Sequence, residues 1–179
     1  EPVCLLGTAF AFVHFLDRCT EQNARFRLPS GSRIIDTGGY KGRSREVAKD
    51  ELYRLYETTM DVPQHYIINE YGMTEMATQF YDSVLVDKTN GISSNRHKVI
   101  PPWARTVVVN PDTLERTPKG EVGLLRHLDL ANLSSIIGIQ TEDLGYETEQ
   151  GFEVLGRARG AETRGCSIAV DELLSALES

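Results

Sequence analysis

The sequence predicts an α/β fold, in which helices flank a parallel sheet and a smaller antiparallel, barrel-like β subdomain follows. Two observations lead to this prediction. Strand-like segments alternate with helix-like segments within about the first 75 residues, which is typical of a parallel sheet with helices packed on it. Beyond about residue 84, short β-like runs separated by turn residues replace that alternation. We therefore expect an α/β subdomain at residues 1–83 and a β-rich subdomain with a C-terminal helix at residues 84–179.

The first subdomain is predicted from apolar periodicity and from the residues that begin each element. We expect a strand at 3–6, a helix at 7–20, a strand at 32–36, a helix at 45–59 and a strand at 66–69. In the first helix Ala9, Phe12, Val13 and Leu16 recur at helical spacing. Ser44 is the predicted N-cap of the second helix, because a Ser side chain there accepts a bond from a free backbone N–H.

The second subdomain carries β-forming runs bounded by turn residues. The expected strands cover 105–109, 122–130, 136–140 and 152–155, and an amphipathic helix at 169–177 ends the chain. Residues 87–95 are the best loop candidate, because small and polar residues dominate them.

Composition excludes several classes of protein. Of the 179 residues 40% are hydrophobic and 25% are charged, which predicts an ordinary globular chain. A net charge of −7 argues against a nucleic-acid partner, whose backbone favours a basic stripe. No apolar run approaches the roughly 20 residues of a membrane span. Cys4, Cys19 and Cys166 form an odd, unpatterned set, which predicts a reducing, cytoplasmic compartment and no zinc site.

The beginning of the chain predicts a fragment or a processed piece of a longer protein. Glu1 stands where an initiator Met or a signal peptide would be expected, and the chain starts almost inside a hydrophobic segment.

Residues 69–75, Asn-Glu-Tyr-Gly-Met-Thr-Glu, are the strongest candidate for a functional site. They follow the apolar run at 66–68, so they lie at the carboxyl end of a strand, where open α/β sheets bind ligands. Tyr71 offers a flat face for a base, and Thr74 offers a hydroxyl for a phosphate oxygen. Glu75 supplies a carboxylate that, with a phosphate, can hold Mg²⁺. The alternative is a surface turn after a core strand.

Two glycines and two charged residues elsewhere suit the same ligand. Gly38 and Gly39 follow a strand, and glycines let main-chain amides approach a nucleotide closely. Asp143 ends an apolar β run, where an acidic residue can accept hydrogen bonds from a ribose diol. Arg157 follows the last β run and offers its fork to a ribose or phosphate oxygen. Each also has a plainer interpretation. The two glycines can belong to an ordinary turn, Asp143 can be a β-turn residue, and Arg157 can be a surface side chain.

Cys166 is the candidate nucleophile. Arg164 and Gly165 precede it, and the last predicted helix follows it. An adjacent cation and a helix N-terminus both lower the pKa of a thiol and favour the nucleophilic thiolate. The alternative is a buried, inert cysteine.

Together these motifs resemble the adenylate-forming superfamily of acyl-CoA synthetases and their relatives. The superfamily's Tyr-Gly-x-Thr-Glu segment matches residues 71–75, and its Thr-Gly-Asp-Leu-Gly segment matches Thr-Glu-Asp-Leu-Gly at 141–145. Its Gly-Arg after a strand matches 156–157, and its adenine-side turn matches 38–39. The resemblance implies the C-terminal part of an adenylate-forming core.

Within that superfamily the chain resembles the acyl-protein synthetase branch, the LuxE-type fatty-acid-activating component of a bacterial luminescence reductase. Gly-Gly-Tyr-Lys at 38–41 and Arg-Gly-Cys-Ser at 164–167 carry this resemblance. In that branch a Cys close to the C-terminus receives the acyl group, and Cys166 lies 13 residues before the final Ser179.

The resemblance implies a set of residues for ATP or AMP and for Mg²⁺. The nucleotide-binding residues are Gly38, Gly39, Tyr40, Asn69, Tyr71, Gly72, Asp143 and Arg157. Among them Tyr71 stacks on adenine, and Asp143 binds the ribose hydroxyls with help from Arg157. Thr74 contacts the α-phosphate, and Glu75 coordinates Mg²⁺.

The implied reaction has two steps. A fatty acid, or another carboxylate, is activated by ATP as an acyl-adenylate, which is mainly a task of positioning and charge stabilisation. Cys166 of the same protein then takes the acyl group as a thioester. Thr74 and Glu75 complete the implied catalytic set. An acyl reductase or a carrier is the implied partner that receives the acyl group.

The chain departs from the family pattern in ways that limit this expectation. The family's phosphate loop, which normally lies in the N-terminal half, has no match, and neither has its C-terminal domain with a catalytic Lys. Glu142 stands where the family often has Gly. We expect the chain to hold half of a site whose other half lies in a missing N-terminal half.

Two other functions stay open at the level of sequence. An acyl- or aryl-CoA ligase, or an enzyme similar to coenzyme F390 synthetase, would pass its group to a diffusible acceptor, and a requirement for free CoA would favour it. A non-catalytic adenylate-binding or partner-docking module would bind AMP without turnover.

Overall fold

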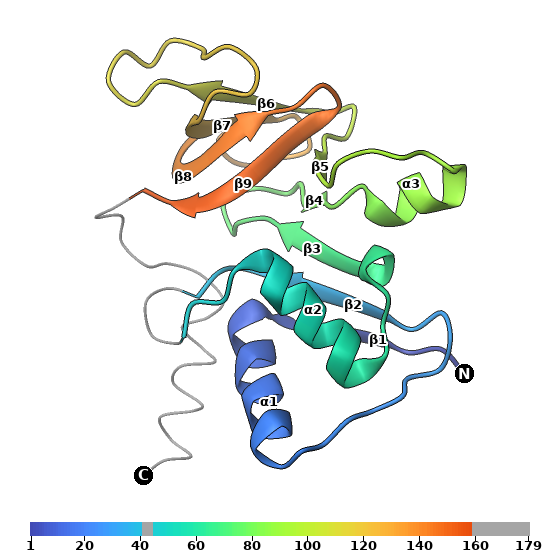
Figure 1. Ribbon diagram of the computed structural model, residues 1–179. Helices are drawn as coiled ribbons and strands as arrows, with labels where there is room; N and C mark the ends of the chain where they lie inside the picture. The colour runs from blue at the N-terminus through green and yellow to red at the C-terminus, as the bar shows by residue number, and fades with distance from the viewer. Residues whose placement is uncertain (41–44, 159–179) are drawn as a thin grey trace. The chain divides into compact units, whose positions relative to one another are not determined.

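The computed structural model describes residues 1–40 and 45–158, and their contacts divide into two compact units. Unit 1 covers the described residues up to Glu70, and unit 2 covers those from Tyr71 onward. The contacts divide the chain between residues 70 and 71, whereas the sequence changes character near residue 84. The subdomain boundary between residues 83 and 84 stays a prediction. Figure 1 labels the α-helices and strands of both units.

Unit 1 is the predicted parallel sheet with helices. Its elements are β1 (Cys4–Thr8), α1 (Ala9–Glu21), β2 (Arg33–Thr37), α2 (Lys49–Met60), the 3₁₀ turn η1 (Gln64–Tyr66) and β3 (Ile67–Tyr71). The strands pair in parallel in the order β1-β2-β3, which sets Leu6 beside Ile35 and Ile35 beside Ile68. The prediction of an α/β fold is confirmed.

The core of unit 1 forms where the apolar faces of α1 and α2 meet the sheet. Leu16 of α1, Tyr56 of α2 and Ile34 of β2 are fully buried in one cluster. Thr8 caps α1, because its hydroxyl accepts a hydrogen bond of 3.2 Å from the Ala11 N–H.

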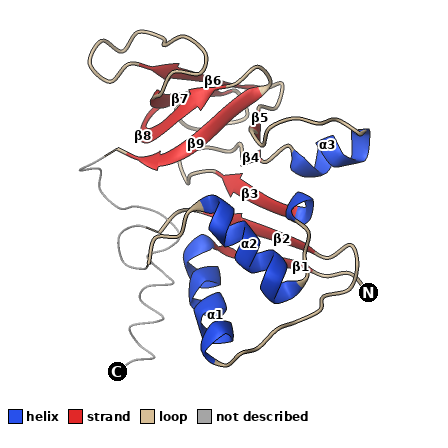
Figure 2. Cartoon of the chain, in the orientation of Figure 1, coloured by secondary structure: helices blue, strands red, loops and turns tan. Residues whose placement is uncertain are grey.

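Unit 2 is the predicted antiparallel part. Its elements are β4 (Phe80–Tyr81), α3 (Val84–Asn90), β5 (Lys98–Val99), β6 (Ala104–Val109), β7 (Gly123–Asp129), β8 (Gly138–Glu147) and β9 (Gly151–Arg157). Five strands pair antiparallel in the order β5-β9-β8-β7-β6, drawn as red arrows in Figure 2. Phe80, Val108, Leu125 and Phe152 are fully buried in the core of this unit.

Several predicted element boundaries were wrong. Ala48, not Ser44, holds the N-cap position of α2, and no side chain caps that helix. Asp50 and Glu51 occupy its first turn instead, where negative charge favours the helix dipole. The predicted loop 87–95 begins inside α3, and Gly91, at φ +68°, ends that helix. The predicted helix at 169–177 lies outside the described residues.

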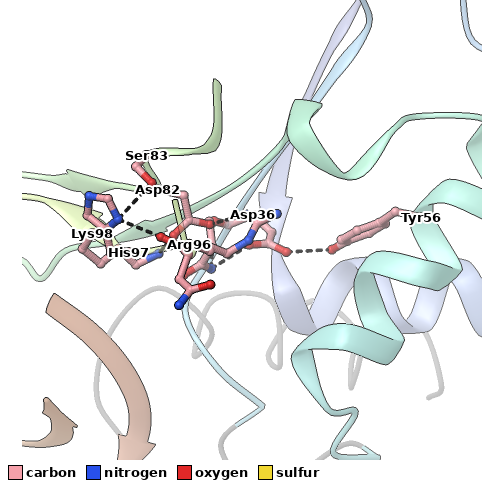
Figure 3. A network of polar contacts seen from close by, with 9 residues as sticks. Asp36, Tyr56, Asp82, Ser83, Arg96, His97 and Lys98 are labelled. Carbon is pink, nitrogen blue, oxygen red and sulfur yellow. Dashed lines mark hydrogen bonds and ion pairs between the residues drawn. The ribbon is translucent and has the colours of Figure 1, made fainter. Parts of the chain in front are cut away.

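A buried ion cluster joins β5 to the residue that follows β4. Lys98 is 0% exposed, and its Nζ donates to Asp82 Oδ1 at 2.6 Å. Arg96 Nη1 donates to the other carboxylate oxygen at 2.6 Å (Figure 3). Two cations therefore share one buried carboxylate, which makes this corner sensitive to loss of either partner.

Neither α1, α2 nor α3, the α-helices of the described residues, has the length and apolar character that a bilayer-crossing helix needs.

Candidate functional site

In unit 1 the predicted residue Asn69 lies near the carboxyl end of β3, beside Asp36 of β2. The parallel register pairs these two residues. Asn69 Nδ2 donates to Asp36 Oδ1 at 2.6 Å, and the Tyr56 hydroxyl donates to Asp36 Oδ2 at 3.1 Å (Figure 3). Burial and the adjacent Asp36 charge raise the pKa of Tyr56 well above its ordinary value, so it stays a donor.

The backbone after β2 is open at the two predicted glycines. Gly38 has φ +73°, a conformation that side chains other than glycine rarely adopt. A Cβ built on Gly38 or Gly39 would meet no atom of the described residues within 4 Å. Tyr40 is half-buried, and its burial, with the nearby Asp36 charge, raises its pKa to about 12.

In unit 2 three of the predicted residues form one hydrogen-bonded group. The half-buried Tyr71 donates its hydroxyl proton to Asp143 Oδ2 at 2.7 Å. Arg157 Nε donates to the other oxygen, Asp143 Oδ1, at 3.3 Å. Burial, followed by the Asp143 charge, raises the pKa of Tyr71 well above its ordinary value. A carboxylate accepts about four hydrogen bonds, so Asp143 keeps acceptor capacity for a ligand.

Asp143 does not lie where the sequence placed it. The predicted strand 136–140 continues as β8 to Glu147, so Asp143 lies within a strand and not after one. Its register partner on β9 is Arg157, and the pairing is irregular between Leu144 and Gly145. A side chain at Gly145 would collide with the Glu153 carbonyl, so the close approach of β9 needs glycine there. The irregularity belongs to the strand pair that carries both charged residues.

The Tyr71 ring lies in an aromatic cluster. The rings of Phe80, His127 and Phe152 have centroids 6.2, 5.6 and 5.9 Å from that of Tyr71. These contacts fix the plane of the Tyr71 ring, which the sequence predicts to stack on a base. Gly72 follows directly and is half-buried.

Thr74 and Glu75 are exposed, in a segment that Asp129 holds in place. Thr74 Oγ1 donates to Glu75 Oε2 at 3.1 Å. Further along, Asp129 at the end of β7 accepts hydrogen bonds from the N–H groups of Ala77 and Thr78 at 3.0 and 2.8 Å. Burial opposes the ionisation of Asp129, but hydrogen bonds from the Thr78 hydroxyl and from the N–H groups of Thr78, Ala131 and Ala77 outweigh it and lower its pKa. Asp129 thus anchors the chain just after the Thr74–Glu75 pair.

One carboxylate is available for Mg²⁺ in this segment. Within residues 1–40 and 45–158, no group of three or more His, Cys, Asp or Glu side chains could hold a metal alone. Mg²⁺ commonly binds one or two carboxylates together with substrate phosphates, and an exposed Glu75 fits that pattern.

Three residues that hold predicted site residues or their segment were not predicted from the sequence. Asp36 accepts a hydrogen bond from Asn69, and His127 contacts Tyr71. Asp129 accepts a hydrogen bond from the Thr78 N–H. Each is a polar residue in or at the end of an apolar strand run, and that position was the signal that could have found it. Cys166 lies outside the described residues.

The chain resembles known proteins over almost its whole length. A family model described as "Acyl-protein synthetase, LuxE" matches residues 1–175. A long-chain-fatty-acid–luciferin-component ligase of Vibrio harveyi is 24% identical over 98% of this chain and 46% of its own length. A ligase of the same description from Aliivibrio fischeri is 23% identical over 97% of this chain and 46% of its own length. The chain thus spans about half of these relatives.

Solved structures resemble the chain as well. A structure of McyG A-PCP complexed with phenylalanyl-adenylate superposes with a TM-score of 0.59 and 19% identity, over 86% of this chain and 26% of that one. At this identity the likeness shows the fold alone.

Proposed function

Because this chain belongs to the LuxE acyl-protein synthetase family, we propose that it carries the C-terminal part of an ATP-dependent fatty-acid-activating site. In this proposal the complete protein converts a fatty acid to an acyl-adenylate and transfers the acyl group to its own Cys166. The Tyr71–Asp143–Arg157 group is the observation that carries it, since it offers an aromatic ring and a charged acceptor together.

The proposed nucleotide-binding residues have distinct tasks. Tyr71 stacks on adenine, and Asp143 accepts hydrogen bonds from the ribose diol while Arg157 holds the carboxylate in place. Asn69, Gly38, Gly39, Tyr40 and Gly72 supply the edge of the adenine site. The positive φ at Gly38 and the open backbone at Gly38 and Gly39 support a close approach of the base to main-chain amides.

Thr74 and Glu75 are the proposed residues for the phosphate part of the nucleotide. Thr74 donates to an α-phosphate oxygen, and Glu75 supplies one ligand to Mg²⁺, which contributes charge neutralisation when bound. Both side chains are exposed and hydrogen-bonded to each other, so a ligand reaches them without unburying either.

The two bond changes balance without a further reactant. The fatty-acid carboxylate forms a bond to the α-phosphorus, and the bond to pyrophosphate breaks. The Cys166 thiolate then forms a bond to the acyl carbon, and AMP leaves with the electron pair of the broken bond. An acyl reductase or a carrier is the proposed next acceptor.

Thioester formation tests this function. The complete protein, incubated with labelled fatty acid, ATP and Mg²⁺, should acquire a label that hydroxylamine removes. Cys166→Ser should abolish it, whereas Cys4→Ser, which changes an exposed cysteine of β1, should not. Label that persists in Cys166→Ser would refute the acceptor, and a requirement for free CoA would favour a CoA ligase.

The length of the chain gives a second test. The isolated 179 residues, which match only 46% of the length of the relatives, should bind AMP weakly and should not form acyl-AMP. Pyrophosphate release that depends on fatty acid would show that the isolated chain is active. AMP binding without turnover by the complete protein would indicate a binding module instead.

A further inference from the structure

A buried histidine and a threonine extend the Tyr71–Asp143 pair on its Tyr71 side. His127 on β7 is 0% exposed, and both of its ring nitrogens face a hydroxyl group. Nδ1 lies 2.9 Å from Thr106 Oγ1 on β6, and Nε2 lies 3.4 Å from Tyr71 Oη. The contacts run from Thr106 through His127 and Tyr71 to Asp143.

The donors in this chain of contacts follow from the carboxylate at its end. An ionised carboxylate only accepts, so the single hydroxyl proton of Tyr71 points to Asp143. Tyr71 Oη can then only accept from His127, which requires the proton on Nε2. Nδ1 is left as the acceptor of the Thr106 hydroxyl proton, so every group has a partner.

We infer that His127 is a positioning residue: as the neutral tautomer with its proton on Nε2, it holds the Tyr71 hydroxyl on Asp143 and so orients the carboxylate for the ribose. This inference rests on the proposed function of Asp143. The Nε2–Oη distance of 3.4 Å makes this the weakest link, so its contribution is orientation more than stability.

The surroundings of His127 favour the neutral ring. The aromatic rings of Phe80 on β4 and Phe152 on β9 have centroids 5.2 and 5.6 Å from it. Asp129 on β7 is the charge that acts on His127, and Asp143 on β8 and Arg157 on β9 act on the neighbouring Tyr71. Burial lowers the pKa of His127 to about 4, and the Asp129 charge only partly opposes this. The ring therefore carries one proton at neutral pH, and the contacts decide on which nitrogen it lies.

Nitrogen NMR tests the tautomer directly. In the complete protein labelled with ¹⁵N-histidine, His127 should show a protonated Nε2 and a bare Nδ1 at pH 7, assigned by the loss of its signals in His127→Gln. Nδ1 protonation, or a doubly protonated ring, would overturn the inference. This measurement needs no nucleotide, so it gives a result whether or not the proposed function holds.

Binding measurements test the effect on the ribose site. His127→Leu removes both ring nitrogens, and His127→Gln keeps a donor of similar reach. We expect His127→Leu to weaken AMP binding about tenfold, with most of the loss recovered in His127→Gln. In a Tyr71→Phe background, which lacks the hydroxyl, His127→Leu should have little further effect.

A ribose analogue separates positioning from general loss of structure. 2′,3′-Dideoxy-AMP lacks the hydroxyls that Asp143 would bind, so its affinity should change little in His127→Leu. An equal loss for both nucleotides, or additive losses in the double variant, would overturn the inference. If the complete wild-type protein binds no AMP, the proposed function fails, and the ribose role of His127 fails with it.

Discussion

At the scale of single residues, a carboxylate in each unit holds a residue of the proposed nucleotide site. Asp36 holds Asn69 in unit 1, and Asp143 holds Tyr71 in unit 2. In each pair a carboxylate is the acceptor, so the donor group of its partner is fixed in direction. A ligand therefore meets preorganised groups and has less conformational freedom to remove on binding.

The neutral state of His127 predicts a pH dependence of stability. An unfolded histidine has a pKa of about 6.5, and burial lowers that of His127 to about 4. Between these values the unfolded chain binds a proton that the folded chain does not. Stability should therefore be full above about pH 6.5 and fall by roughly 3 kcal/mol as the pH drops to about 4. Urea unfolding of wild type and His127→Gln across this range should show a shallower slope in the variant, and equal slopes would contradict the prediction.

The sequence predicted some of these residues as site candidates but did not predict their partners. Tyr71, Asp143 and Arg157 were found because each follows an apolar run, and they do lie together. Asp36 and His127 were missed because their importance depends on neighbours from other strands. A polar residue in an apolar run marks such a position, but the contacts come from other elements and are set by tertiary structure.

At the scale of elements, the two glycines after β2 differ in backbone conformation. Gly38 has a positive φ and Gly39 does not, yet among residues 1–40 and 45–158 a Cβ at either would meet no atom within 4 Å. Gly38→Ala should thus cost about 1–2 kcal/mol of stability, because a Cβ strains this backbone. Gly39→Ala should change stability by less than about 0.5 kcal/mol.

AMP binding distinguishes the two variants further. If the Gly39 amide lies against the nucleotide, Gly39→Ala should lower AMP affinity while its unfolding midpoint stays near that of wild type. Unchanged affinity would remove Gly39 from the proposed site. Calorimetric titration of the complete protein, with urea unfolding of both variants, measures the two effects separately.

We expect Asp129 to hold the segment after Glu75 in place. Its carboxylate accepts from the N–H groups of Ala77, Thr78 and Ala131. Asp129→Ala leaves these donors without their acceptor and should cost on the order of 3–5 kcal/mol. Asp129→Asn keeps one acceptor oxygen and should cost less. Amide hydrogen exchange should speed up at Ala77 and Thr78 in both variants, and unaltered exchange there would show that other contacts hold the segment.

Local patterns predicted the types of these elements better than their ends. Asp50 and Glu51 stabilise the start of α2, which has no capping side chain. The prediction of an N-cap at Ser44 therefore placed the start of this helix too early in the sequence. Residues Val84–Asn90 form α3 although Thr89 and Asn90 favour turns, because helix propensity is only a weak prior.

At the scale of the whole molecule, each of the two compact units has its own apolar core. Leu16 of α1 and Leu125 of β7 are both fully buried, one in each core. Leu16→Ala and Leu125→Ala should each cost about 2–5 kcal/mol. Hydrogen exchange should report the loss mainly at β2 for Leu16→Ala and mainly at β8 for Leu125→Ala. Equal loss of protection in both sheets would indicate that the chain unfolds as one unit.

Trp103 gives the protein a built-in optical probe. It is the single tryptophan of the chain, it is half exposed, and its indole N–H donates to Thr78 Oγ1 at 3.0 Å. Thr78 in turn donates to Asp129, so the indole is linked to the segment that carries Thr74 and Glu75. Indole emission depends on hydration and on such hydrogen bonds. Intrinsic fluorescence of the unlabelled, unmutated protein therefore reports whether adding a nucleotide changes the surroundings of this indole.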